Sequence, residues 1–167
     1  MSDSNASIAI KPSLGLLLRD PVHMLAFGFG SGLAPRAPGT FGTLLALVLY
    51  VPLAQLGLGV YSAVVVLAGA AGVWICGASS KKLGVHDHGG IVWDEFVGLW
   101  IALWAVPFEW PWMLLGFALF RFFDVLKPWP IRLLDQRVHG GVGIMIDDVV
   151  AGLMACLCLH VVIGWLA

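Results

Sequence analysis

Long apolar runs, separated by short polar segments, make up most of this 167-residue chain. Residues 60–78 and 144–166 are the longest, and each approaches or reaches the roughly 20 residues that an α-helix needs to cross a bilayer. Shorter or interrupted apolar runs occupy residues 22–29, 44–56, 91–106 and 112–125. This pattern predicts an all-α integral membrane bundle with four to five spans, several of them short.

The boundaries of the predicted elements follow from local signals. Asp20-Pro21 predicts a helix start, with Asp as the cap and Pro in the first turn. Residues 28–43 are too rich in Gly and Pro for a continuous helix and predict a loop. The first residues are polar and lack the features of a cleavable signal peptide. We therefore expect a polar lead over residues 1–20 and one membrane-embedded domain over residues 21–167.

Composition supports the membrane assignment. The chain is 60% hydrophobic and only 11% charged, whereas soluble domains carry about 25% charged residues. The formal net charge of −1 argues against nucleic-acid binding, which needs a basic surface. The three cysteines lie in apolar runs without metal-binding spacing, so we interpret them as small buried residues.

Basic residues orient the predicted spans. They fall in the polar segments around residues 19–36, 81–82 and 121–137, whereas the turns at residues 55–59 and 107–111 have none. Because basic loops stay on the cytoplasmic side of a membrane, the polar loops are predicted to face the cytoplasm. The polar residues that could take part in catalysis or binding lie at the same ends of the apolar runs. The site is therefore expected to face the cytoplasmic leaflet.

Two short segments repeat each other and carry paired acids. Gly90–Glu95 reads G-I-x-x-D-E and Gly143–Asp148 reads G-I-x-x-D-D, and together they hold four of the ten acidic residues. Each pair is followed by a small-residue step, at Gly98 and at Ala151-Gly152. Such a step lets another helix or a lipid headgroup approach closely.

Ionised carboxylates in an apolar environment are costly unless positive charge compensates them. A bound divalent cation is the simplest compensation, and ligands that are all oxygen favour Mg²⁺ over Zn²⁺. The two acidic pairs therefore predict a Mg²⁺ site at a membrane. The alternative is that they are solvated acids at helix N-termini, stabilised by the helix dipole.

A third polar segment begins at Arg121. Arg121, Asp124 and Lys127 are spaced by three residues, so on a helix they lie along one face. Asp124 is then a further candidate metal ligand, and the two cations are candidates for binding phosphate oxygens. The alternative is a ladder of salt bridges whose members satisfy one another.

The Gly-rich loop and a histidine pair give weaker signals. The loop matches neither common phosphate-binding glycine motif in full, but its N–H groups and the hydroxyls of Ser31, Thr40 and Thr43 could bind a headgroup. Its glycines could equally serve helix packing. His86 or His88, just before the first acidic pair, is a candidate for proton transfer or substrate binding, or a plain loop residue.

Four blocks together resemble the signature segments of the phosphatidylglycerophosphatase A family, in that family's order. The blocks are GFGSGLAPRAPGTFG (28–42), HDHGGIVWDEFVG (86–98), RFFDVLKPWPI (121–131) and GGVGIMIDDVVAG (140–152). The resemblance implies a Mg²⁺-dependent phosphatase of the bacterial inner membrane that acts in phospholipid metabolism. It would remove the terminal phosphate of phosphatidylglycerophosphate to give phosphatidylglycerol, and no obligatory protein partner is evident.

The residues predicted to act in such an enzyme fall into two groups. The candidate catalytic and metal-binding residues are Asp94, Glu95, Asp124, Asp147 and Asp148. The candidate phosphate-binding residues are Arg121, Lys127, Thr40, Ser31 and His86. One or two Mg²⁺ ions would orient an attacking water, or a carboxylate would attack directly. A cation transporter with acids along its pathway and a non-catalytic membrane scaffold are the alternatives from other classes.

Overall fold

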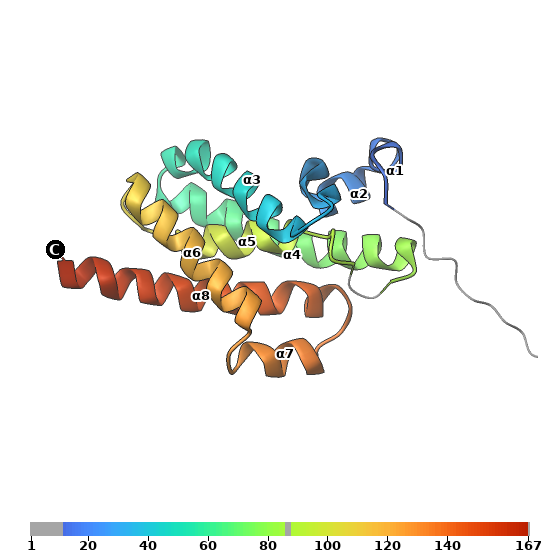
Figure 1. Cartoon of the computed structure of the whole chain (residues 1–167). Helices are drawn as coiled ribbons and strands as arrows, with labels where there is room; N and C mark the ends of the chain where they lie inside the picture. The colour runs from blue at the N-terminus through green and yellow to red at the C-terminus, as the bar shows by residue number, and fades with distance from the viewer. Residues whose placement is uncertain (1–11, 86–87, 167) are drawn as a thin grey trace, which may run out of the picture.

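The computed structural model describes residues 12–85 and 88–166, and these residues form helices and no strand (Figure 1). The elements are α1 (Leu14–Arg19), α2 (Pro21–Ala26), the 3₁₀ segment η1 (Gly28–Leu33), α3 (Pro38–Leu53), the 3₁₀ segment η2 (Ala54–Leu56), α4 (Leu58–Leu83), α5 (Trp93–Ala102), α6 (Trp110–Leu126), α7 (Ile131–Arg137) and α8 (Gly140–Leu166). The predicted all-α membrane bundle is confirmed. His86, a predicted phosphate-binding residue, lies outside the described residues.

Three described stretches are long and apolar enough to cross a membrane: Pro38–Leu56, Leu58–Leu83 and Gly140–Leu166. The 17 residues of α6 and the 10 residues of α5 are shorter. The chain nevertheless runs between the two ends of the bundle in α3, in α4, in α5 with its following loop, in α6 and in α8 (Figure 1). By length and composition, the described residues thus provide three membrane spans where four to five were predicted, because α5 and α6 are too short.

The predicted helix start at Asp20 is confirmed. The Asp20 carboxylate accepts a hydrogen bond of 2.9 Å from the Val22 N–H, and Pro21 is the first residue of α2. The helix α1, which precedes it, lies in the segment predicted as a polar lead. Its Leu17 is buried with Ala26 and Phe27, so the described part of the lead packs on the bundle.

The Gly-rich segment is only partly a loop. In η1, Gly28, Phe29 and Gly30 have positive φ angles, which break any continuous helix. However, α3 begins at Pro38, well before the apolar run that starts at Leu44. Proline at the first helical positions has its φ angle already set for a helix, and this explains the early start.

Close contact between α5 and α8 forms the centre of the bundle. A Cβ atom on Gly98 would lie 2.9 Å from the Asp148 carbonyl oxygen, and one on Gly152 would meet the Gly98 carbonyl group. The backbones of the two helices therefore touch at the small-residue steps that follow the acidic pairs. The buried ring of Phe120 packs beside this contact.

Candidate active site

The predicted site residues come together because of the directions of three helices, α5, α6 and α8. Glu95 lies at the start of α5 and Asp147 near the start of α8, whereas Arg121 lies near the end of α6. Because α6 runs opposite to α5 and α8, these segments meet at one end of the bundle, the end where α7 lies (Figure 1). The two sequence repeats are thus brought to the same place.

Arg121 is the centre of one half of the cluster. Its Nη1 lies 2.5 Å from Glu95 Oε2 and 2.6 Å from Asp124 Oδ2. The Thr43 hydroxyl donates a hydrogen bond to the same Glu95 carboxylate and lies 3.5 Å from Arg121 Nη1. The predicted shared face of Arg121 and Asp124 is confirmed, and the arginine joins α6 to α5.

Lys127 is the centre of the other half. It ends α6 with a positive φ angle, so it leaves the helical face that carries Arg121 and Asp124. Its Nζ lies 2.6 Å from Asp147 Oδ2 and 2.7 Å from Asp135 Oδ1. Burial alone would lower the pKa of Lys127, but the hydrogen bonds that its ammonium group donates to Asp135 and Asp147 outweigh burial and raise the pKa above its usual value. The two carboxylates therefore favour the charged form of Lys127.

Sequence reasoning missed Asp135. The polar segment after Lys127 gave no helix prediction, yet residues 131–137 form α7 and place this carboxylate beside the lysine. The acid lies eight residues after Lys127 and belongs to no repeated motif. A short polar helix following two prolines was the only available signal, and it is weak.

The acidic pair on α8 is buried. Asp147 is 8% exposed and Asp148 is 3% exposed. One oxygen of each, Asp147 Oδ1 and Asp148 Oδ2, is buried without a hydrogen-bond partner among the described residues. The charges of Asp94, Glu95, Asp124 and Asp147 all act on Asp148, so the predicted carboxylates share one electrostatic environment. Buried carboxylate oxygens without partners are unfavourable, and this site therefore favours a cation.

The donor set fits Mg²⁺ in its chemistry. The five carboxylates offer only oxygen ligands, and two of their buried oxygens lack any described hydrogen-bond partner. Within residues 12–85 and 88–166, however, no three acidic, His or Cys side chains already converge on one ion position. Three of the acids instead contact the cations Arg121 and Lys127.

The predicted phosphate-binding hydroxyls lie in different places. The Ser31 hydroxyl donates to the Gly28 carbonyl oxygen at 2.8 Å and so holds its own loop. Thr40 is half-buried in the first turn of α3. Thr43, one turn further, is the hydroxyl that enters the cluster. His88 Nδ1 accepts a hydrogen bond from the Gly90 N–H at 3.0 Å, which shapes the turn before α5.

Gly39 is a second residue that sequence reasoning did not single out for the cluster. A Cβ atom there would meet Glu95 Oε1 and would lie 3.2 Å from Arg121 Nη1. The missing side chain at Gly39 therefore leaves room for the Glu95–Arg121 pair. The Pro-Gly-Thr run at the start of α3 is the sequence signal for this close approach.

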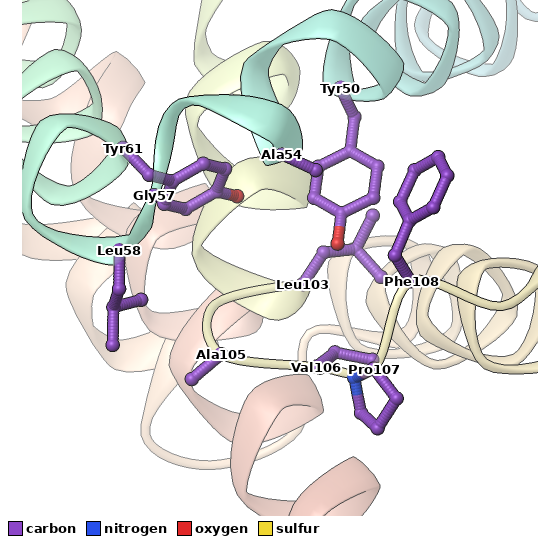
Figure 2. Close-up of a pocket in the computed structure, with 10 residues that line it drawn as sticks. All are labelled: Tyr50, Ala54, Gly57, Leu58, Tyr61, Leu103, Ala105, Val106, Pro107 and Phe108. Atoms are coloured by element: carbon purple, nitrogen blue, oxygen red, sulfur yellow. The ribbon is translucent and has the colours of Figure 1, made fainter.

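A separate cavity of about 380 Å³ lies at the other end of the bundle (Figure 2). It lies between the turn joining α3 to α4 and the loop after α5, and its described lining residues carry no charge. The rings of Tyr50 and Tyr61 meet edge to face there, with centroids 6.0 Å apart. This cavity lacks the acids and cations of the cluster, so the candidate chemistry lies at the other end.

The fold and the cluster define a multi-pass helical membrane protein with an acid-rich polar site inside one end of its bundle. The sequence model of the family described as Phosphatidylglycerophosphatase A matches residues 24–163, and the chain belongs to this family of phosphatases. The resemblance seen in the four sequence blocks is therefore confirmed.

Three bacterial relatives illustrate the similarity. The chain is 51% identical to "Phosphatidylglycerophosphatase A" of Escherichia coli (strain K12) over 87% of this chain and 85% of the relative. It is 46% identical to the Haemophilus influenzae protein of the same name, over 93% and 96%. It is 41% identical to a "Putative phosphatidylinositol-3-phosphatase" of Bacteroides thetaiotaomicron, over 83% and 91%. No solved structure matches the chain.

Proposed function

We propose that this protein hydrolyses the terminal phosphomonoester of phosphatidylglycerophosphate, giving phosphatidylglycerol and phosphate for phospholipid synthesis. The observation that carries the proposal is the meeting of two acidic repeats with Arg121 and Lys127 at one end of a membrane bundle. Membership of the family and the names of two relatives supply the substrate.

The proposed cofactor is Mg²⁺, held by carboxylates from the set Asp94, Glu95, Asp124, Asp147 and Asp148. When bound, the ion would neutralise phosphate charge and favour nucleophilic attack at phosphorus. The unpartnered oxygens of Asp147 and Asp148 support this assignment, because a buried carboxylate needs a positive or hydrogen-bonding partner. These carboxylates would hold one or two Mg²⁺ ions.

The two cations are proposed to bind the phosphate. Arg121 presents its guanidinium to two carboxylates and Lys127 presents its ammonium group to two others, so an arriving phosphate would find donors already in place. They would then stabilise negative charge on the transferring group. Thr43 is proposed to orient Glu95 through their hydrogen bond.

The attacking group is water or a carboxylate. Attack by water gives phosphate directly, whereas attack by an aspartate oxygen breaks the ester bond and leaves a phosphorylated carboxylate that water then hydrolyses. Trapping with hydroxylamine during turnover distinguishes these routes, because only an aspartyl-phosphate yields a hydroxamate on the protein.

The proposed location is the inner membrane, with the site on the cytoplasmic side. Every described Lys and Arg lies at the end of the bundle that holds the acid cluster, whereas Glu109 lies at the other end. The positive-inside rule supports a cytoplasmic location for the basic end.

The test of the function is phosphate release by the purified protein in detergent micelles, with added Mg²⁺ or with a chelator. We expect release from phosphatidylglycerophosphate only with Mg²⁺, and a loss of at least about 100-fold in Asp94→Asn and Asp147→Asn. Glu109→Gln, at the far end, is the matched control. Near-normal activity in both Asn variants would show that the site assignment is wrong.

The same assay separates the alternatives. Phosphatidylinositol 3-phosphate belongs in the substrate panel, because one relative carries the corresponding name. A transporter or a scaffold would release phosphate from neither lipid. A transporter would instead carry cations across the membrane of proteoliposomes, and its flux would fall in the Asn variants.

A further inference from the structure

A second polar cavity adjoins the acid cluster at the turn between α6 and α7. It measures about 450 Å³, and its lining includes Lys127, Trp129, Arg132, Leu133 and Gln136. Lys127 belongs to both sites, because its Nζ also lies 2.6 Å from Asp147 Oδ2. A ligand in this cavity would therefore lie beside the proposed catalytic carboxylates.

Arg132 is the free cation of this cavity. Arg121 and Lys127 each contact carboxylates, whereas no described carboxylate lies within 4.0 Å of the Arg132 guanidinium. Gln136 lies one turn further along α7 and lines the same cavity with an amide group. A guanidinium and an amide on one helical face are suited to the oxygens of a phosphate ester.

The surroundings of the cavity are apolar and exposed. Trp129 is 80% exposed, and Leu126, Val125 and Phe122 on the last turns of α6 are also exposed. Tryptophan with a neighbouring apolar surface is typical of the membrane–water interface. A lipid could thus place its acyl chains along α6 with its headgroup at Arg132.

We propose that this cavity binds the phosphodiester group of the lipid substrate and that Arg132 is a specificity-determining residue that recognises it. This inference rests on the proposed function, whose substrate carries two phosphates. The terminal phosphomonoester would reach the acid cluster past Lys127, while the phosphodiester that joins the glycerol units stays with Arg132 and Gln136. Arg132 would then select lipids that have a second phosphate.

The test compares two lipid substrates in Arg132→Gln. Phosphatidylglycerophosphate carries both groups, whereas phosphatidate carries a phosphomonoester without the phosphodiester. We expect KM for phosphatidylglycerophosphate to rise about tenfold with kcat within about twofold, because an interaction made equally in ground state and transition state is lost. For phosphatidate, kcat/KM should change by less than about twofold. Arg137→Gln, on the same helix but outside the cavity, should leave both substrates unaffected.

A measurement of inhibition gives the same test without phosphatidate. Phosphatidylglycerol keeps the phosphodiester and lacks the terminal phosphate, so its inhibition constant should rise in Arg132→Gln by about the same factor as KM. Inhibition by diacylglycerol, which lacks the phosphodiester, should not change. An unchanged unfolding midpoint would show that the variant is folded.

The outcomes separate this inference from the function on which it rests. If the wild-type protein releases phosphate but Arg132→Gln behaves like Arg137→Gln, the phosphodiester site is wrong and the function stands. If Arg132→Gln also weakens diacylglycerol inhibition, the residue has a general structural role and the inference is wrong. If the wild-type protein releases no phosphate, both proposals are overturned.

Discussion

Asp148 is the most buried of the described acids that have a side-chain oxygen without a described hydrogen-bond partner. It is 3% exposed, its Oδ2 has no described hydrogen-bond partner, and four neighbouring carboxylates act on it. A negative charge in that place is unfavourable on its own. Without a cation, an ionised Asp148 therefore destabilises the fold, and the same burial and unpartnered oxygen suit it to bind a cation.

The first prediction concerns Asp148→Asn. In the absence of Mg²⁺ its unfolding midpoint in detergent should equal or exceed that of the wild type, because a buried charge is removed. Saturating Mg²⁺ at about 100 times its Kd should stabilise the wild type by about 2.7 kcal/mol and the variant by much less. Glu109→Gln should keep the full shift. A Mg²⁺ shift retained in Asp148→Asn would contradict a metal role for this carboxylate.

The second prediction concerns Gly39→Ala. The added Cβ atom would meet Glu95 Oε1, so we expect the Glu95 side chain to move away from Arg121. Displacement of a catalytic group by about 1 Å can cost about 100-fold in rate, so phosphate release should fall about tenfold to 100-fold. The unfolding midpoint should change little, since alanine is the better helix former.

Gly59→Ala is the matched control for Gly39→Ala. Gly59 also lies in the first turn of a membrane-spanning helix, but a Cβ atom there would have nothing within 4 Å. Its activity should equal that of the wild type. Equal activity in both variants would show that the close approach at Gly39 does not matter for the chemistry.

At the scale of elements, the α5–α8 contact positions the two acidic pairs. The Gly152 Cα faces the Gly98 carbonyl group, and Gly98 faces the Asp148 carbonyl oxygen. The small residues therefore set the distance between the two helix starts that carry the acids. Any increase in side-chain size here separates the carboxylates as well as the helices.

The third prediction follows for Gly152→Ala. Its Cβ atom would meet backbone, which cannot rotate away, so we expect a loss of about 1–3 kcal/mol in the free energy of unfolding. Thermal unfolding in detergent measures this change. Gly164→Ala on the same helix has open space around its Cβ atom and should unfold like the wild type. A Gly152→Ala protein as stable as Gly164→Ala would contradict the close helix contact.

The sequence predicts the helices more completely than it predicts the residues of the site. Apolar runs and the Asp20-Pro21 cap predict the helices, because burial in lipid and capping are local properties. The repeated acidic pairs and Arg121 predict the cluster, because charge in an apolar chain demands compensation. Asp135 had only a weak sequence signal, and the Pro-Gly-Thr run that contains Gly39 does not show which side chain it approaches, since both contacts form only in the folded bundle.

At the scale of the whole molecule, charge is distributed unevenly along the membrane normal. Every described Lys and Arg lies at the end that holds the acid cluster, and the turns at the other end contain Glu109 but no base. Within the described residues, three stretches, Pro38–Leu56, α4 and α8, are long and apolar enough to reach both membrane surfaces (Figure 1). The orientation of the protein therefore decides which leaflet supplies the substrate.

The fourth prediction tests that orientation with single cysteines at the two ends, Glu109→Cys and Arg137→Cys. A membrane-impermeant maleimide added to intact spheroplasts should label Glu109→Cys, and it should label Arg137→Cys only after the membrane is permeabilised. The parent protein is the control, because Cys76 is buried and Cys156 and Cys158 lie within α8. The reverse pattern would place the acid cluster at the outer surface, and its lipid substrate would then have to be present in the outer leaflet.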